Sequence, residues 1–429
     1  MAEGALARTK VLESAASREL TSDLPVRIPD GSMLVEHEPV PFTNYPYEWT
    51  PEMLHSAATL TLQLARAAMR AGFVLKDATP YNVMFHGPRP VFLDLLSFRR
   101  RDPLESMWPP YAQFVRTFVY PLLACEYFGL RLDELLLVHR DGLEPGRMLG
   151  LCPLYRRLLP PFLGSVTVPA LLEGRDKDLS PHRYGVRKAR DTDEATFLLE
   201  RLFARANRLL GERPPQPRRS AALSYMDSGH NYRETEFAEK ERFLGKAFEK
   251  WPPACVLDIG CNTGHFSLIA ARNGARVVAI DHDPDAAGML WRSACDGNSN
   301  VLPLLMDIAR PPGACGWANR ECISFLDRAR GQFDYVLLLA LIHHLLVNER
   351  IPLLTILELA AELTTRFAVI EYVDPADSQF QRIARGRDAL HRDLTREAFE
   401  AAACSCFQIV ESHDVSPTRR VYLLRKAGS

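Results

Sequence analysis

Several features that would place a chain in a specialised class are missing from this sequence. No apolar run reaches the roughly 18 residues that a transmembrane helix needs, so no membrane span is expected. The N-terminal residues contain no long apolar stretch, so no secretory signal peptide is predicted. The nine cysteines are scattered and form no Cys-x-x-Cys pair, which indicates free thiols in a reducing cytoplasm and no metal site.

An excess of charge of one sign is also missing. The chain has 52 basic and 53 acidic residues and a formal net charge of −1. This balance does not indicate a nucleic-acid binder, which would typically be basic. With 429 residues, of which 47% are hydrophobic, the chain is long enough for two domains with well-packed cores.

The most informative stretch is VLDIGCNTGHFS, residues 256–267. Its apolar start is typical of a buried parallel strand. Gly260 and Gly264 bracket the turn that follows, and Thr263 is predicted to be the N-cap of the next helix. Because Gly260 has no Cβ, a ligand can lie against the loop, and the first N–H groups of the helix point toward it.

A carboxylate follows this turn at an informative distance. The next apolar strand, RVVAID, ends in Asp281. An acid about 20 residues after a Gly-containing strand–helix turn is placed to accept hydrogen bonds from both hydroxyls of a ribose. An ordinary α/β crossover without a ligand is the alternative, but the agreement of the two motifs in spacing favours a ligand site.

Together, LDIGCNTGHFS and VVAIDHDP resemble the S-adenosylmethionine-binding motifs of class I methyltransferases. The resemblance covers residues 230–429 and implies a Rossmann-like α/β fold with a seven-stranded, mostly parallel sheet and helices on both faces. It implies S-adenosylmethionine as cofactor, with Asp258 near its methionine end, the glycines against it and Asp281 on its ribose. Asn262 replaces the middle glycine of that family. Asparagine tolerates positive φ better than most residues, so we expect the turn to form.

Further site residues follow the next strands. NVLPLLMDI is predicted to be the third strand, ending at Asp307. The resemblance implies that Asp307 contacts the adenine amino group, and a helix cap is the alternative. His343 and His344 lie just beyond the fourth strand, where an open α/β sheet carries its site, so one of them is a candidate general base. Because adjacent side chains diverge, at most one is expected to face the cleft; a structural role for both stays open. Glu371, in the fifth strand, is a candidate for substrate contact.

The N-terminal half contains a second pattern, FVLKDATPYNVMFHGPRPVFLDLLSF. A polar loop with Asp77 and Asn82 is followed by two short strands and then by Asp94. This order resembles the catalytic loop and metal-binding aspartate of protein-kinase-like folds. By this resemblance Asp77 would match the base, and Asn82 and Asp94 would match the metal ligands. A helix predicted to begin after the N-cap Thr50 precedes the loop, as in that family.

The kinase resemblance is incomplete where a kinase holds its nucleotide. No Gly-rich phosphate loop lies upstream, and Lys10 is the only lysine before Lys76. The upstream segment is also too short for a complete small lobe. We therefore expect a truncated kinase-like large lobe without phosphoryl transfer, in which the three polar side chains hold loops together by hydrogen bonds. Ligand or metal binding without transfer is the alternative.

These patterns predict four regions: a weakly structured segment (1–34), a mostly helical kinase-like module (35–210), a Pro- and Arg-rich linker (211–230) and a class I methyltransferase domain (231–429). The chain is expected to be a cytoplasmic S-adenosylmethionine-dependent methyltransferase acting on a small-molecule or glycan-type acceptor. It is similar to bacterial methyltransferases, some of which are labelled nodulation-related. The alternatives are a cofactor-binding scaffold without turnover and a small-molecule kinase fused to a methyltransferase.

Overall fold

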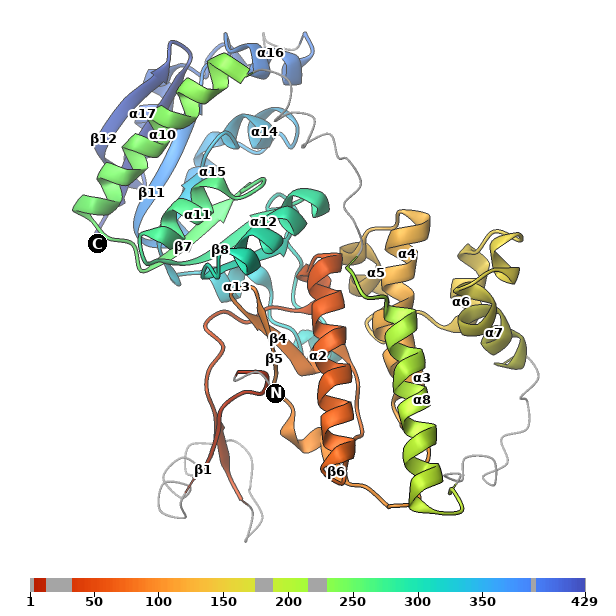
Figure 1. The fold of residues 1–429 in the computed structure, drawn as a ribbon. Helices are drawn as coiled ribbons and strands as arrows, with labels where there is room; N and C mark the ends of the chain where they lie inside the picture. The colour runs from red at the N-terminus through yellow and green to blue at the C-terminus, as the bar shows by residue number, and fades with distance from the viewer. Residues whose placement is uncertain (1–3, 13–32, 174–187, 215–229, 387–390, 429) are drawn as a thin grey trace.

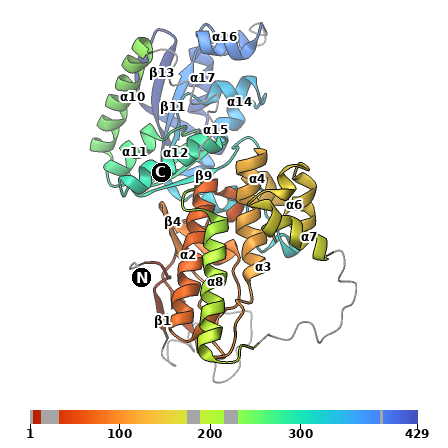
Figure 2. The same cartoon turned by 45° about the vertical axis from the view of Figure 1, so that its right-hand side comes forward.

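The computed structural model describes residues 4–12, 33–173, 188–214, 230–386 and 391–428. The C-terminal half forms a seven-stranded sheet with helices on both faces, and the N-terminal half is mostly helical (Figures 1 and 2). Within the described ranges, every helix is too short or too polar to cross a bilayer.

The sheet has the strand order β12-β13-β11-β10-β7-β8-β9. Strands β7 to β11 run parallel, whereas β13 pairs antiparallel with both β11 and β12. The predicted α/β class and seven-stranded, mostly parallel sheet are therefore confirmed. The strands are β7 (Cys255–Ile259), β8 (Arg276–Asp281), β9 (Val301–Leu305), β10 (Phe333–Leu338), β11 (Thr364–Val373), β12 (Phe407–Ser416) and β13 (Arg419–Lys426).

Successive side chains of each strand point to opposite faces of the seven-stranded sheet, which divides its hydrophobic core into two layers. In β7, Val256 belongs to one buried cluster and Leu257 to the other, because successive side chains point to opposite faces. The Val256 layer packs against α10 (His230–Lys250), α11 (His265–Arg272) and α12 (Pro284–Asp296). The Leu257 layer packs against α13 (Phe325–Ala329), α15 (Leu353–Leu363) and α17 (Arg396–Cys404). Two short helices, α14 (Ile342–Val347) and α16 (Ser378–Ala384), follow the ends of β10 and β11.

The N-terminal half is built around two long helices and a small hairpin. Helix α2 (Pro51–Arg70) begins as predicted, because the Thr50 hydroxyl accepts a hydrogen bond from the Met53 N–H. It packs against α8 (Thr192–Leu210). The other elements are β3 (Phe73–Leu75), η2 (Pro80–Asn82), β4 (Val83–His86), β5 (Arg89–Phe92), η3 (Leu95–Ser97), β6 (Phe98–Arg100), α3 (Tyr111–Phe114), η4 (Val115–Val119), α4 (Tyr120–Phe128), α5 (Leu132–Val138), α6 (Pro145–Leu151), η5 (Arg156–Leu158), η6 (Leu163–Thr167) and α7 (Val168–Glu173).

The first 34 residues, predicted to be weakly structured, include a short paired strand. Strand β1 (Thr9–Val11) pairs antiparallel with β2 (Val35–His37), and the Ala7 N–H donates to the Phe92 carbonyl. Residues 13–32 lie outside the described part of the chain. The predicted linker, 211–230, also lies mostly outside it, so the domain boundaries stay a prediction.

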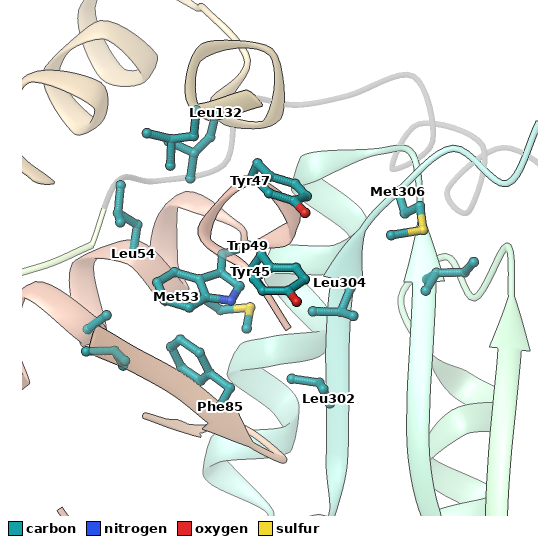
Figure 3. Close-up of a cluster of buried hydrophobic side chains, with 14 of the residues drawn as sticks. Tyr45, Tyr47, Trp49, Met53, Leu54, Phe85, Leu132, Leu302, Leu304 and Met306 are labelled. Atoms are coloured by element: carbon teal, nitrogen blue, oxygen red, sulfur yellow. The ribbon is translucent and has the colours of Figure 1, made fainter. Parts of the chain in front are cut away.

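An aromatic segment joins the two halves. Residues 45–49, with the sequence YPYEW, form η1 (Pro46–Glu48) and its flanks. Figure 3 shows the side chains of Tyr45, Tyr47 and Trp49 in one cluster with those of Leu302, Leu304 and Met306, which come from and directly follow the edge strand β9. These side chains belong to one buried cluster that continues through both halves. The sheet edge at β9 is therefore packed against the N-terminal half, not left free.

A buried ion pair lies within this interface. The Arg328 guanidinium, on α13, donates to the Glu48 carboxylate and to the Thr43 carbonyl. It also lies over the Tyr45 ring, 4.8 Å from its centroid. The Glu48 side chain is fully buried, and burial raises its pKa although Arg328 opposes this. Because the pair is desolvated, each charge depends on its partner to stay in the interior.

We predict that Arg328→Ala lowers the free energy of unfolding by about 3–5 kcal/mol, because it leaves the Glu48 carboxylate buried without a partner. Urea unfolding followed by tryptophan fluorescence measures this change. Arg330→Ala is the matched control. The Arg330 side chain is 48% exposed and pairs with Glu362 at the surface. Its removal should therefore lower the free energy of unfolding by less than about 1 kcal/mol. Equal losses in the two variants would contradict a special role for the interface pair.

Candidate functional site

A cavity of about 520 Å³ opens at the carboxyl ends of the parallel strands. It lies where β7 has β8 on one side and β10 on the other, so the strand order reverses there. Crevices at such a point are where open α/β sheets bind ligands. Seven of the eight site residues predicted from the sequence line the cavity: Asp258, Gly260, Asn262, Asp281, Asp307, His343 and His344.

The eighth predicted residue, Gly264, does not line the cavity. Its φ is +80°, and a Cβ added there would lie 2.1 Å from the Leu290 side chain on α12. This glycine therefore permits helix α12 to pack against the turn. Gly264 also occupies the N-cap of α11, so the assignment of Thr263 as the N-cap was wrong. The chain reaches the helix in a left-handed conformation, which favours glycine at this position.

The turn itself brings backbone groups to the cavity. Gly260 has φ +73°, and a Cβ there would lie 3.1 Å from the Leu341 side chain. Asn262 has φ +50°, so the asparagine adopts the left-handed conformation that we expected it to tolerate. Its N–H donates to the Asp281 carboxylate at 2.7 Å, which ties the turn to the end of the neighbouring strand.

Two buried carboxylates lie at the ends of neighbouring strands. Asp281 also accepts the Asp283 N–H at 2.9 Å, while Asp258 accepts the Ser267 hydroxyl at 2.6 Å. Their exposed fractions are 3% for Asp258 and 7% for Asp281. Among the described residues, no basic side chain forms an ion pair with Asp258, and the ring that pairs with Asp281 is that of the adjacent His282, at 3.4 Å.

Because Asp258 and Asp281 are buried without a strong cationic partner, the pKa of each carboxyl group is raised. Desolvation raises the pKa of Asp258 to about 6, although the Ser267 hydrogen bond opposes the shift and the nearby Asp281 adds to it. Desolvation likewise raises the pKa of Asp281 against its two backbone hydrogen bonds. Two carboxylates in one cavity whose pKa values are raised by burial are typical of a binding site. A ligand with a positive charge and hydroxyl donors would stabilise the ionised form of both carboxylates.

Asp307 lies two residues beyond the third strand, because β9 ends at Leu305 and not at Asp307 as predicted. Its carboxylate accepts the Ala309 N–H at 2.9 Å and pairs with Arg310 at 3.0 Å. It therefore stabilises a local turn while lining the cavity. The neighbouring Met306 lines the cavity and also belongs to the interface cluster with the N-terminal half.

Both histidines line the cavity, so the expectation that only one would face the cleft was wrong. They lie in the first turn of α14, and their ring centroids are 4.4 Å apart. His343 is buried, and its Nδ1 has no hydrogen-bond partner among the described residues. Desolvation, helped by His344, lowers the pKa of His343 to about 3, so this imidazole is neutral at physiological pH. Desolvation also lowers the pKa of His344.

A buried network of four charges lies beside His343. The Glu371 carboxylate pairs with Lys240 at 2.7 Å and with Arg419 at 3.5 Å, and Arg419 forms two 2.9 Å bonds to Asp377. Glu371 also accepts the N–H of Ala340, which has φ +54° in the loop before α14. The network thus holds the backbone that carries the histidines.

This network corrects one prediction and adds a site residue. Glu371 is fully buried and does not line the cavity, so it does not face the substrate as its place in the strand suggested. Lys240, on α10, does line the cavity. Nothing in the local sequence around Lys240 signalled this position, because its partner Glu371 is distant in the chain.

The N-terminal half reaches the loop that follows β8. Arg131, at the start of α5, donates from Nη2 to the His282 carbonyl at 3.0 Å. The same guanidinium is held by two hydrogen bonds to Asp133. Because His282 follows Asp281 directly, this contact fixes the backbone next to the buried acid.

The kinase-like pattern folds into the expected loop and hairpin, but its three polar residues lie outside the cavity. Asn82 reaches the Asp77 carbonyl and the Ser97 hydroxyl at 3.4 Å each, and the Ser97 hydroxyl donates to Asp94. These bonds agree with a loop-holding role, although the Asp77 Oδ1 is buried without a partner in the described structure. Among the described side chains, no group of three or more His, Cys, Asp or Glu residues could hold a metal ion.

Comparison with known proteins identifies the C-terminal half. Residues 229–403 match the family model described as a methyltransferase domain. The chain is also 28% identical over 391 residues to the nodulation protein NoeA of Rhizobium meliloti (strain 1021), covering 90% of this chain and 80% of that protein. The predicted resemblance of the C-terminal half to methyltransferases and the predicted similarity to nodulation-related proteins are therefore confirmed.

Two solved structures are among those with a similar fold. The N-methyltransferase NodS from Bradyrhizobium japonicum WM9, in complex with S-adenosyl-L-homocysteine, is 14% identical with a TM-score of 0.35, covering 48% of this chain and 93% of that chain. The bifunctional kinase-methyltransferase WbdD is 19% identical with a TM-score of 0.29, covering 48% of this chain and 40% of that chain.

We predict that Asp258→Asn stabilises the ligand-free protein at pH values above about 6. The folded-state pKa of Asp258 is about 6, whereas the ordinary value is 3.8, so folding of the wild type is penalised once the carboxyl ionises. The penalty amounts to as much as about 3 kcal/mol above the folded pKa and disappears below the ordinary one. Thermal unfolding at a series of pH values measures the difference between the variant and the wild type.

The exposed Asp296, at the end of α12, provides the control substitution, Asp296→Asn. Its difference from the wild type should be small, because the side chain is exposed. An advantage of Asp258→Asn that stays constant between about pH 4 and pH 8 would contradict the raised pKa.

Proposed function

We propose that this protein transfers the methyl group of S-adenosylmethionine to a small-molecule or glycan-type acceptor. The observation that carries the proposal is the pair of buried carboxylates, Asp258 and Asp281, at the carboxyl ends of neighbouring strands in one cavity. The cofactor has an ammonium group, ribose hydroxyls and a sulfonium, which are the positive charge and hydrogen-bond donors that these acids require. The methyltransferase-domain match over the same residues supports it.

Each chemical part of the cofactor has a fitting group in the cavity. Asp281 would accept the ribose hydroxyls, and Asp258 would face the ammonium end. Gly260 permits the left-handed turn that brings the backbone to the cavity, and a side chain there would press against Leu341 in the cavity lining. Asp307 would lie at the adenine end. When bound, S-adenosylmethionine supplies an already activated methyl group, so the protein has to align the acceptor and accept its proton.

The acceptor would enter where unpartnered polar atoms meet the cavity. His343 Nδ1 and Gln379 Oε1 are both buried and without a hydrogen-bond partner in the described structure, and both residues line the cavity. Together they can orient an acceptor hydroxyl or amine. His343 is neutral at physiological pH, so its ring can accept a hydrogen bond from the acceptor, while its lowered pKa makes it a weak base for full proton transfer. Lys240 also lines the cavity, and its charge is paired with the Glu371 carboxylate.

The size of the cavity supports a small acceptor. About 520 Å³ falls within the range of small-molecule sites, and the cofactor would take up much of it. A small molecule, or the end of a glycan, fits the space that is left. The relatives do not define the acceptor, since the name of NoeA records only nodulation.

A second function for the kinase-like module has one observation in its favour, the buried and unpartnered Asp77 Oδ1 in the described structure. Against it stands the chain upstream of the loop, which contains no Gly-rich loop and only Lys10 as a lysine. In the structure Lys10 belongs to β1, in the small sheet with β2. We therefore propose that the module supports the methyltransferase domain without transferring phosphate.

We predict that Asp281→Ala weakens S-adenosylmethionine binding by about 1.5–3 kcal/mol, because hydrogen bonds to a charged carboxylate are lost. Isothermal titration calorimetry of the full chain measures this. The matched control, Asp296→Ala, removes an exposed acid of the same type and should bind as the wild type does. Equal affinities for Asp281→Ala and the wild type would remove this cavity as the cofactor site.

We predict that His343→Ala slows methyl transfer about a hundredfold or more at saturating cofactor, while cofactor affinity stays nearly unchanged. His344→Ala should have a smaller effect, because His344 is more exposed and its Nδ1 lies near the Asn348 amide. The assay follows labelled methyl from the cofactor into fractions of a bacterial metabolite and glycan extract.

The pH profile tests whether His343 titrates near its ordinary pKa in the folded protein. Because the pKa of His343 is about 3, the wild-type rate should show no acid limb from this group near its ordinary pKa of 6.5. Full activity in both histidine variants would remove proton acceptance by either residue from the mechanism. Cofactor binding without transfer to any fraction would support a binding scaffold.

A further inference from the structure

A projecting unit of the N-terminal half carries an unusual concentration of exposed apolar side chains. Nine of the 22 exposed large apolar residues in the described chain fall within residues 151–172. Figures 1 and 2 both show α6 and α7 of this unit at the outer edge of the molecule. We call these nine side chains the apolar patch: Leu151, Leu154, Tyr155, Leu158, Leu159, Leu163, Val168, Leu171 and Leu172.

The unit is anchored from its other side, so the patch is not simply an unfolded part of the core. Phe162 is buried and packs against the rings of Tyr127 and Phe128, at 5.1 and 5.6 Å between centroids. Met148 and Val166 are also fully buried. The unit is thus two-sided, with one set of apolar residues in the core and a second set in solvent.

The exposed residues follow a helical face where the unit is helical. Val168, Leu171 and Leu172 of α7 are spaced by three and four positions, so they lie on one side of that helix. In the preceding turn, Leu154 and Leu158 are 76% and 70% exposed. A concentration of exposed apolar side chains on one unit is typical of a site that contacts a membrane or another macromolecule.

The charges around the patch distinguish between these partners. Residues 145–172 contain three arginines, Arg147, Arg156 and Arg157, and no acidic residue. The nearest acidic residues in the sequence are Glu144 and Glu173, at the two ends of this segment. An apolar surface whose own segment carries basic residues, with carboxylates only at its two ends, complements a bilayer surface that contains anionic lipids. Tyr155, beside Arg156, has the amphipathic ring that is enriched at membrane interfaces.

We propose that residues 145–172 form a peripheral membrane-binding surface that inserts the apolar patch into the headgroup region of an anionic bilayer. The arginines then meet the lipid phosphates, while the leucines enter the boundary of the acyl chains. This surface belongs to the helical module and is separate from the cavity residues. It would place the methyltransferase domain close to a membrane without a spanning helix.

Co-sedimentation of the full chain with lipid vesicles tests this proposal. The protein is expected to sediment with mixed phosphatidylcholine–phosphatidylglycerol vesicles, more weakly with pure phosphatidylcholine, and less as salt is raised. The double variant Leu154→Gln/Leu158→Gln should lower the partition coefficient by about tenfold or more. The matched control, Leu96→Gln/Leu354→Gln, replaces two exposed leucines outside the patch and should bind as the wild type does.

Each remaining outcome would overturn the proposal. No sedimentation of the wild type with anionic vesicles would exclude a membrane surface. Equal binding by the patch variant and the wild type would place the contact elsewhere, and equal binding to neutral vesicles would remove the role of the arginines. A wild-type dimer that the patch variant dissociates, seen by light scattering without lipid, would assign the patch to self-association. Unchanged thermal unfolding of both double variants verifies that the comparison is between folded proteins.

Discussion

The buried Glu48–Arg328 pair, with the aromatic residues around it, is the contact on which the arrangement of the two halves depends. It joins a short segment before α2 to helix α13 of the sheet domain, and both charges are desolvated. Such a pair adds little net stability compared with apolar packing, but it strongly disfavours any arrangement that separates the charges. The surrounding cluster, with Trp49 and Leu304, supplies the apolar burial that stabilises the contact.

This contact has a consequence for the cavity. Met306 belongs both to the interface cluster and to the cavity lining, and Arg131 of the N-terminal half binds the backbone next to Asp281. The helical module therefore supports one wall of the cavity from outside. Its kinase-like loop lies elsewhere, where Asn82 donates to the Asp77 backbone carbonyl and Ser97 donates to the Asp94 carboxylate. The two parts are thus in direct contact at the wall of the cavity and not merely linked.

The cavity itself holds charge in two different ways. Asp258 and Asp281 lack a strong cationic partner among the described residues, and burial raises the pKa of each. Lys240, Glu371, Arg419 and Asp377 are equally buried but neutralise one another. The desolvation of the first pair is thus uncompensated in the ligand-free protein, and a ligand can compensate it. The second group instead holds the loop that carries the histidines. Binding and positioning are therefore assigned to different charges within the same region of the sheet.

The sequence alone determined the strand–turn–helix at Gly260 and the acid at Asp281. Both depend on local spacing, and the carboxyl ends of parallel strands meet at one edge of the sheet. It could not determine that Gly264 packs on Leu290, that both histidines face the cavity, or that Lys240 meets Glu371. These contacts depend on how separate helices and strands pack, which local spacing does not define. The tertiary structure alone also decided which leucines in 151–172 face solvent, because an apolar stretch has the same pattern whether it enters a core or remains exposed.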